Sequence, residues 1–359
     1  MRLEKLRSAF EQQNLDSILI SSADNRRFLA GFTGSAGYLV ITKSDAILAT
    51  DFRYIEQAGR QSPDFRVHRL GGDPEWLPKL LVDLNAKRVG FEGSDVTFSQ
   101  YQQIISGIQK LPIDSRPELI STSGIIENLR IVKEIPEIES LQRAIDIGDQ
   151  AFNTIGPNIE AGMTERQIAW DLEKVMRDLG ADSVSFDLIV AAGPNAALPH
   201  HRPSDRVVQE GEPVVIDMGA RFDGYCSDLT RTICIGKENE TFRRIYDIVL
   251  GAQLAAINTV TTGISGSDCD QLARSVIEES GYGDNFGHSL GHGVGLAVHE
   301  RPTVGPRSDE ILENGMIFTI EPGIYIPGWG GVRIEDVVIL ENGYARLLSH
   351  ARKLGVDHN

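Results

Sequence analysis

The chain has 359 residues, which is enough for two domains of ordinary size. Its formal net charge is −16, and a nucleic-acid-binding protein normally gains affinity by placing Lys and Arg against phosphates, so we expect no nucleic-acid partner. Acidic residues interrupt every apolar run long before the roughly 20 residues that cross a bilayer, so we also expect no membrane-spanning segment.

The beginning of the chain and its cysteines indicate a cellular compartment. The segment Met1–Arg7 mixes charges from its second residue and has no continuous apolar run of signal-peptide length. The three cysteines are odd in number and lack CxxC spacing, which argues against a disulfide framework or a thiolate zinc site. These features predict a cytoplasmic protein.

The first part of the chain, residues 1–128, alternates helical and strand-like patterns and predicts a small α/β domain. Helices are expected at 1–13, 75–84 and 99–109, and strands at 17–20, 38–42, 46–50 and 88–91. The glycines of Gly31–Gly37 do not follow a strand with GxGxxG spacing, so we expect a tight loop there and no dinucleotide site.

A change of pattern near residues 129–138 predicts a domain boundary. The segment is rich in charge, and Pro136 stands near the start of a long helix, where its missing N–H is harmless. For residues 129–359 we expect helices at 137–155, 164–180, 240–260 and 267–280, with strands at 184–191, 213–220, 231–235, 316–326 and 331–340. This order predicts an α+β domain, an antiparallel sheet with helices on one side.

Two acidic residues interrupt apolar strands in this domain. Asp217 lies in Pro213–Gly219, and Asp228 follows eleven positions later, with the turn signal Asp223–Gly224 between them. A hairpin there would bring the two carboxylates together, and like charges so close need a shared proton or a bound cation.

A similar pattern recurs near the end of the chain. Glu321 and Glu335 also interrupt apolar strands, and the proline and glycines between them allow a second hairpin. Taken singly, each acid has an ordinary structural explanation as an edge or paired residue. Together, the two hairpins predict a metal site with mainly oxygen ligands between two structurally similar halves.

Histidines gather near these acids. Five of the eight lie between positions 200 and 299: His200, His201, His288, His292 and His299. The glycine-rich segment Gly287–Glu300 is unsuited to a regular helix and allows the backbone to approach a site closely. Carboxylates with one or two imidazoles suit Mn²⁺, Co²⁺, Fe²⁺ or Zn²⁺, and two such ions would generate a hydroxide nucleophile near neutral pH. We assign His68, His350 and His358 to structural roles.

These residues lie in five segments: Val215–Gly219, Ser227–Arg231, Gly291–Leu296, Thr319–Gly323 and Gly331–Asp336. Their order and spacing resemble the pita-bread metallopeptidases, in particular the Xaa-Pro aminopeptidase and Xaa-Pro dipeptidase (prolidase) branch. Gly31–Gly37 and Thr50–Tyr54 resemble the creatinase-type N-terminal domain of that branch. The resemblance implies a pseudo-two-fold pita-bread catalytic domain at 129–359, preceded by a creatinase-like domain at 1–128.

The resemblance also implies functional residues. The ligands of two divalent metal ions, with Mn²⁺ expected first and Co²⁺, Fe²⁺ or Zn²⁺ as alternatives, would be Asp217, Asp228, His292, Glu321 and Glu335. Glu321 would also transfer the proton of the attacking water. The other roles fall to His200 and His299 around the reacting carbonyl, His288 on the substrate side, and Arg333 beside an acidic ligand.

One position departs from the prolidase pattern. Prolidases commonly carry an arginine that fixes a dipeptide's carboxylate where this chain has Thr303, although Arg301 or Arg307 lies close in sequence. We therefore expect an Xaa-Pro aminopeptidase acting on small proline-containing peptides, with the dipeptidase as the alternative, and the resemblance implies a homodimer. More remote alternatives are a creatinase-like C–N hydrolase and a non-catalytic binding module of the same fold.

Overall fold

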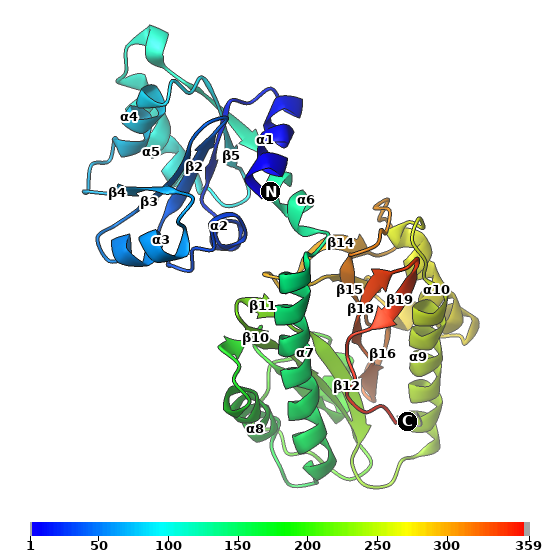
Figure 1. Cartoon of the computed structure of the whole chain (residues 1–359). Helices are drawn as coiled ribbons and strands as arrows, with labels where there is room; N and C mark the ends of the chain where they lie inside the picture. The colour runs from blue at the N-terminus through cyan, green and yellow to red at the C-terminus, as the bar shows by residue number, and fades with distance from the viewer. Residues whose placement is uncertain (1, 355–359) are drawn as a thin grey trace. The chain divides into compact units, whose positions relative to one another are not determined.

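The computed structural model describes residues 2–354, and its contacts divide the chain into two compact units between Arg130 and Ile131 (Figure 1). Of the expectations above, the helix start at Met1 and the assignment of His358 fall outside the described residues. None of the described helices is long and apolar enough to cross a membrane.

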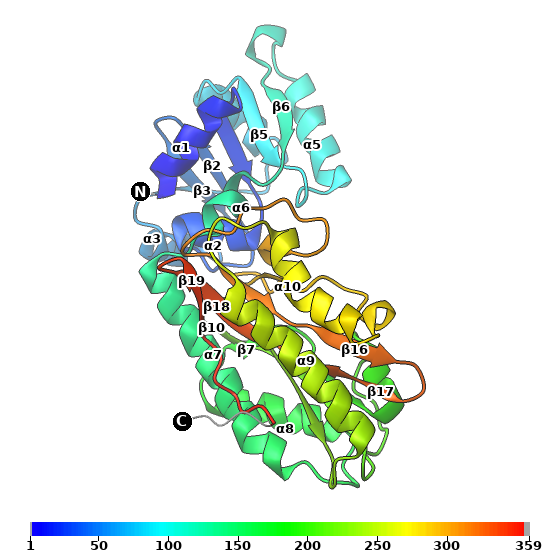
Figure 2. The same ribbon diagram turned by 90° about the vertical axis from the view of Figure 1, so that its right-hand side faces the viewer.

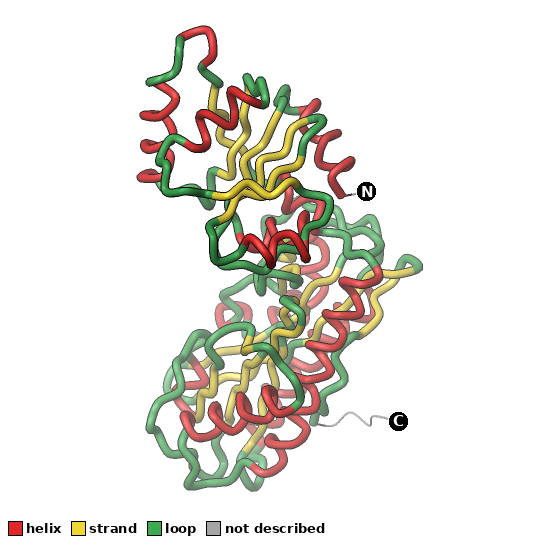
Figure 3. Tube along the Cα trace, turned by 60° about the vertical axis from the view of Figure 1, so that its left-hand side comes forward, coloured by secondary structure: helices red, strands yellow, loops and turns green. Residues whose placement is uncertain are grey.

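The N-terminal unit is built on a six-stranded mixed sheet with strand order β4-β3-β2-β1-β5-β6. All four residues of the inner strand β1 are buried, so both faces of the sheet are covered there, and Figure 3 shows helices around its strands. The strands are β1 (Ser17–Ile20), β2 (Tyr38–Thr42), β3 (Ala46–Thr50), β4 (Arg66–Arg69), β5 (Arg88–Glu92) and β6 (Glu118–Thr122). The helices are α1 (Arg2–Gln12), α2 (Ala23–Ala30), α3 (Ile55–Gln61), α4 (Trp76–Asp83), α5 (Phe98–Gln109) and α6 (Ile125–Arg130).

The predicted α/β pattern of this unit is confirmed, with β1, β2 and β3 at the predicted bounds, but the sequence missed several elements. Both edge strands, β4 and β6, were missed because edge strands are polar and lack an apolar run. Helix α2 was missed because it buries polar side chains: Asn25 donates a hydrogen bond to Glu92. Gly31 ends α2 with φ of 69°, so Gly31–Gly37 begins as a loop, as predicted.

The C-terminal unit contains two halves with the same order of elements. Each half begins with a long helix and a 14-residue helix and continues with antiparallel strands. The first half comprises α7 (Ile135–Ile155), α8 (Glu165–Asp178), β7 (Ser183–Val184), β8 (Ile189–Ala192), β9 (Pro213–Met218), β10 (Ala220–Phe222), β11 (Tyr225–Cys226) and β12 (Leu229–Cys234). The second comprises α9 (Glu240–Thr259), α10 (Gly266–Glu279), β13 (Gly291–Gly293), β14 (Glu300–Val304), β15 (Ile317–Ile320), β16 (Gly323–Ile326), β17 (Gly330–Arg333), β18 (Asp336–Glu341) and β19 (Tyr344–Leu347).

Each half has a hydrophobic core of its own. One cluster packs α7 and α8 against β8, β9 and β12, and the other packs α9 and α10 against β15 to β18, as Figure 2 shows for α9. The halves are joined where the amide of Glu335 donates to the carbonyl of Thr230 at 3.1 Å. The predicted α+β arrangement and the repeated halves are confirmed.

The main error in this unit concerns strand continuity. The runs predicted at 184–191, 213–220, 316–326 and 331–340 are each split into two strands. One break lies at Gly219, where a Cβ would come within 2.1 Å of the Ser227 carbonyl oxygen. Two others lie at Glu321–Pro322 and Ile334–Glu335, so the chain leaves regular strand geometry where it presents these acids. The short strands β11, β13, β14 and β19 were also missed, because they are too brief to show a period.

Candidate active site

The first predicted hairpin is present. Strands β10 and β11 pair antiparallel through Asp223 and Gly224, which have φ of 45° and 74°, the positive values of a two-residue type I′ turn. Strand β12 then returns beside β9, with Thr230 opposite Asp217. Asp228 is buried between β11 and β12. Both carboxylates therefore come from one folded-back segment.

The second predicted hairpin is also present. Strands β16 and β17 pair antiparallel with Gly323 opposite Arg333, so Glu321 precedes the hairpin and Glu335 follows it. The hydroxyl of Thr230 donates to Glu335 Oε2 at 2.7 Å. This bond ties the second hairpin to the first.

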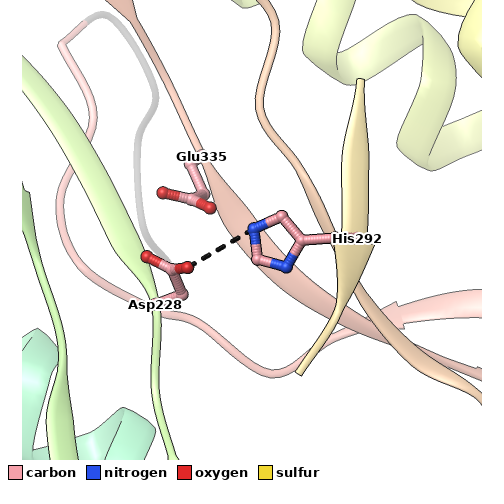
Figure 4. A group of neighbouring side chains, drawn as sticks. All are labelled: Asp228, His292 and Glu335. Carbon is pink, nitrogen blue, oxygen red and sulfur yellow. Dashed lines mark ion pairs between the residues drawn. The ribbon is translucent and has the colours of Figure 1, made fainter. Parts of the chain in front are cut away.

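His292 completes this arrangement from β13. Its Nε2 lies 3.6 Å from Asp228 Oδ2 and 3.4 Å from Glu321 Oε1, and its Nδ1 lies 3.1 Å from the Gly293 carbonyl oxygen. Figure 4 shows Asp228, His292 and Glu335 pointing toward one another, and one donor atom from each lies within 4.8 Å of the others. These three side chains could hold a metal ion.

The remaining predicted residues surround the same space. A cavity of about 580 Å³ is lined by all nine residues singled out from the sequence: Asp217, Asp228, His292, Glu321, Glu335, His200, His288, His299 and Arg333. The His299 ring centroid lies 4.2 Å from that of His292. His68 and His350, which were assigned to structural roles from the sequence, are not among the residues that line this cavity.

Two family models match the chain: metallopeptidase family M24 over residues 139–342 and the creatinase/prolidase N-terminal domain over residues 2–132. The chain belongs to metallopeptidase family M24. It is therefore a hydrolase, and the family implies divalent metal ions.

The similarity to known proteins extends over almost the whole length of this chain. The Xaa-Pro dipeptidase of Pyrococcus furiosus is 38% identical over 98% of this chain and 99% of that protein. The solved structure of an Xaa-Pro dipeptidase from Bacillus anthracis has a TM-score of 0.94 and 43% identity, covering 98% of both chains. An X-Pro aminopeptidase from Thermotoga maritima has a TM-score of 0.89 and 37% identity, again covering 98% of both. The predicted pita-bread fold with its creatinase-type N-terminal domain is confirmed.

The acidic residues of this M24 site fit divalent cations. Burial, reinforced by repulsion from Glu335 and Asp217, raises the pKa of Asp228 well above its ordinary value. Burial likewise raises the pKa of Glu335 well above its ordinary value and that of Glu321 to about 8. Asp217 Oδ1 is buried and has no hydrogen-bond partner among the described residues. A nearby cation would satisfy this oxygen and favour the charged form of all these carboxyls.

Two half-buried histidines are suited to act as neutral groups. Burial lowers the pKa of both His288 and His292 to about 4, so both rings are uncharged at neutral pH. His292 Nδ1 donates to the Gly293 carbonyl, so Nε2 carries no proton and directs its lone pair toward Asp228 and Glu321. His288 Nδ1 donates to the Ser289 carbonyl at 2.8 Å, so its Nε2 accepts from the Tyr325 hydroxyl at 2.9 Å.

Arg333 is a buried cation that holds the acidic residues in place. Its Nη2 donates to Asp217 Oδ2 at 2.6 Å, and its Nη1 donates to the Tyr325 hydroxyl at 2.9 Å. Its Nε donates to Thr230 Oγ1 at 3.1 Å, and that hydroxyl donates to Glu335. Arg333 therefore contacts one acid directly and a second through Thr230.

Sequence reasoning missed several residues of this site. Thr230 and Tyr325 link Arg333 to its neighbours, and Glu165 accepts a hydrogen bond from His201 at 2.8 Å beneath the segment that carries His200. Threonine and tyrosine are common in strands, so neither gave a signal. Glu165 stood in a predicted helix, but its burial was not visible in the sequence.

Proposed function

We propose that this chain hydrolyses the N-terminal Xaa-Pro bond of small peptides, with two divalent metal ions as cofactors. The observation that carries the proposal is the convergence of two buried carboxyls, two half-buried carboxyls and one neutral imidazole on a single cavity. Such a donor set has no structural use without a cation, because mutual repulsion and burial oppose its charged form.

We assign the metal ligands as Asp217, Asp228, His292, Glu321 and Glu335. When bound, the two ions polarise the peptide carbonyl and lower the pKa of a water molecule. Glu321, held in its carboxylate form by the ions, takes the proton of the attacking water and passes it to the leaving nitrogen.

Four further residues act on the substrate or on the ligands. His299 donates to the scissile carbonyl oxygen, and His200 stabilises the tetrahedral intermediate or its leaving nitrogen. His288 contacts the substrate, with its ring fixed by Tyr325. Arg333 holds Asp217 and, through Thr230, Glu335.

Proline at the second position agrees with the cavity's apolar wall. Proline has no amide hydrogen and restricts the residue before it, so it is recognised by shape and not by backbone donors. The wall contains Phe186, Ile189, Pro199 and Val298, which offer apolar contact to a ring.

The length of the peptide is the finer question. The sequence favoured an aminopeptidase, but similar proteins are named dipeptidases more often, so dipeptides are the first substrate that we propose. Cleavage of longer peptides is the second candidate, because Thr303, an exposed residue of the cavity wall, provides no cation for a dipeptide's carboxylate. Arg301, two positions away, is bonded to Glu310 at 2.7 Å.

Three further attributes are proposals as well. Manganese is the metal we propose, because four carboxylates to one imidazole is an oxygen-rich set. We also propose a cytoplasmic protein, in agreement with three free cysteines, and a homodimer, which sedimentation of the purified chain would test.

The function is tested by hydrolysis of Ala-Pro, Ala-Pro-Ala and Ala-Ala-Ala by chelator-stripped protein resupplied with Mn²⁺, Co²⁺ or Zn²⁺. We expect metal-dependent cleavage of the Ala-Pro bond and no cleavage of Ala-Ala-Ala. Asp228→Asn should lower the rate at least about a hundredfold, because even outer-shell changes cost tenfold to a hundredfold.

The matched control is Asp247→Asn, an exposed acid on α9, which should leave the rate unchanged. Rapid cleavage of Ala-Ala-Ala would contradict proline specificity. Cleavage of none of the three peptides would contradict the peptidase proposal.

A further inference from the structure

A second hollow adjoins the active-site cavity. It has a volume of about 710 Å³ and shares His288, Ser289 and Thr303 with that cavity, so these residues form a common wall. Its far side is formed by the segment that follows β14, including Pro306, Arg307 and Asp309. A peptide that extends past Thr303 would enter this second hollow.

The segment that forms the far side is firmly held. Residues Gly305 to Ser308 form a turn, with the Ser308 amide donating to the Gly305 carbonyl at 3.0 Å. The Ser308 hydroxyl donates back to the Thr303 carbonyl at 2.7 Å, and the Ser267 amide of α10 donates to the Ser308 carbonyl at 2.9 Å. The third residue of this braced turn is Arg307, which is exposed.

The turn also lies against the wall of the active site. A Cβ at Gly305 would come within 2.4 Å of Ser289 Oγ. Only glycine allows this approach without displacing Ser289, so the turn is placed close to the shared wall.

The charges around the hollow leave one cation uncommitted. Arg274 makes four hydrogen bonds, to both carboxylate oxygens of Asp270 and to the carbonyls of Phe286 and His288, so its charge is already paired. Arg301 is paired with Glu310. Arg307 has no hydrogen bond or ion pair with any described residue.

We propose that this second hollow binds the C-terminal carboxylate of peptides longer than two residues, and that Arg307 is the group that recognises it. The inference rests on the proposed Xaa-Pro peptidase function and specifies its substrate class. Arginine binds carboxylates through paired N–H donors. Each added residue extends a peptide by about 3.5 Å, so a tripeptide carries its carboxylate beyond Thr303 toward Arg307.

Asp309 lines the same hollow with the opposite charge. Its negative charge weakens the attraction of the hollow for a peptide's carboxylate. It gains no compensating contact with the peptide's free amine, because in the proposed orientation that amine lies at the metal ions. Removing its charge should therefore act opposite to removing that of Arg307.

The test measures kcat/KM of metal-loaded protein for Ala-Pro, Ala-Pro-Ala and the amide Ala-Pro-Ala-NH2. With Arg307→Gln we expect about a tenfold loss of kcat/KM for Ala-Pro-Ala. We expect no change for Ala-Pro, whose carboxylate does not reach Arg307, and none for the amide, whose C-terminus is uncharged. Asp309→Asn should raise the Ala-Pro-Ala value.

Other outcomes separate this proposal from the proposed function. If the unchanged protein cleaves Ala-Pro and not Ala-Pro-Ala, the peptidase function stands and the carboxylate subsite is wrong. The subsite is also wrong if Arg307→Gln lowers the tripeptide and its amide equally, or if both variants lower all rates, because the turn's fold and not its charge would then be responsible. If no Xaa-Pro bond is cleaved, the proposed function itself fails.

Discussion

Glu321 differs chemically from an exposed glutamate because its side chain is only 16% exposed. Its carboxylate lies 3.4 Å from the neutral imidazole of His292 and accepts from the Thr319 hydroxyl at 3.3 Å. Burial raises its pKa to about 8, so without a cation it holds a proton at neutral pH. Bound metal ions would release this proton, because they favour the carboxylate form.

This residue predicts how the stability of the metal-free protein depends on pH. A carboxyl with a raised pKa binds more protons folded than unfolded, so the free energy of unfolding falls as pH rises toward the folded pKa. The histidines with pKa near 4 act in the opposite direction, but only up to their ordinary pKa of 6.5. Between pH 6.5 and about 8, the raised pKa of Glu321 dominates over the two histidines, so the free energy of unfolding should fall as pH rises.

The measurement is the thermal unfolding midpoint of chelator-stripped protein at several pH values between 6.5 and 8. The midpoint should decrease across this range, and excess Mn²⁺ should abolish the decrease by holding the carboxylates charged. A midpoint that rises with pH in the stripped protein would contradict the assignment.

Individual residues of the site could be found from sequence only where their type was unusual for their position. Asp217 and Glu321 were visible because an acid is costly in an apolar strand. The site-forming role of Tyr325 was invisible, since an aromatic residue is ordinary there. His200 and His201 are adjacent, and only the structure shows His201 bonded to Glu165.

At the scale of elements, a buried ion pair holds the strand that follows His292 and His299. Lys133, in the segment before α7, lies 2.8 Å from Glu300, the first residue of β14, and their side chains are 1% and 7% exposed. Glu300 directly follows His299 and pairs across the register shift with Gly293, next to His292. The pair therefore holds the loop that separates the two histidines.

Removing one partner should be costly. Lys133→Met removes a buried cation 2.8 Å from the carboxylate of Glu300, which should lower the free energy of unfolding by about 3–5 kcal/mol and reduce kcat. The double variant Lys133→Met with Glu300→Leu should recover much of the stability, because it removes both charges. Urea unfolding of the purified chains would measure both.

The control for this pair is Lys174→Met, which breaks the exposed pair with Asp178 on α8 and should change stability little. An equally small effect of Lys133→Met would show that Glu300 finds another partner or solvent, and the positioning of the loop would then need another explanation.

Elements were predictable in proportion to their length and regularity. Helix α8 was found because Thr164 begins it as an N-cap and its apolar residues recur with helical spacing. Strand β13, with three residues, and the polar edge strand β4 have no such period. The breaks at Gly219 and Glu335 depend on contacts with distant segments, which no local pattern records.

At the scale of the whole catalytic unit, its last described segment joins the two halves. The amide of His350 donates to Asp149 of α7 at 2.5 Å, and the amide of Leu354 donates to Tyr246 of α9 at 2.9 Å, so the segment lies between both long helices (Figure 1). Arg231 of β12 donates to the Ala351 carbonyl and to Asp336, which is also paired with Lys353. Asp336 is the neighbour of Glu335.

This network predicts an effect of a remote residue on metal binding. Lys353→Met removes a buried charged partner of Asp336, which should lower the free energy of unfolding by about 2 kcal/mol. It should also weaken Mn²⁺ binding about tenfold by loosening Glu335. Calorimetric titration would measure the affinity, and Lys237→Met, an exposed lysine, should leave it unchanged. Unaltered metal affinity in Lys353→Met would separate this network from the site.

The overall architecture was more predictable than the contacts between its parts. Two acid-bearing hairpins indicated two similar halves, and the structure contains them. The buried contacts of Arg231 could not be predicted, because they depend on how residues far apart in sequence meet.

The division of the acidic residues between two hairpins has a consequence for the newly made protein. A ribosome finishes the Asp217–Asp228 hairpin well before Glu321 and Glu335 have been synthesised, and domains fold as units once their chain is available. An unfinished chain thus offers two repelling carboxylates and no second hairpin to share an ion with them. The full set of ligands exists only after both hairpins have been made and have folded, so we expect the metal ions to bind after the catalytic unit has folded.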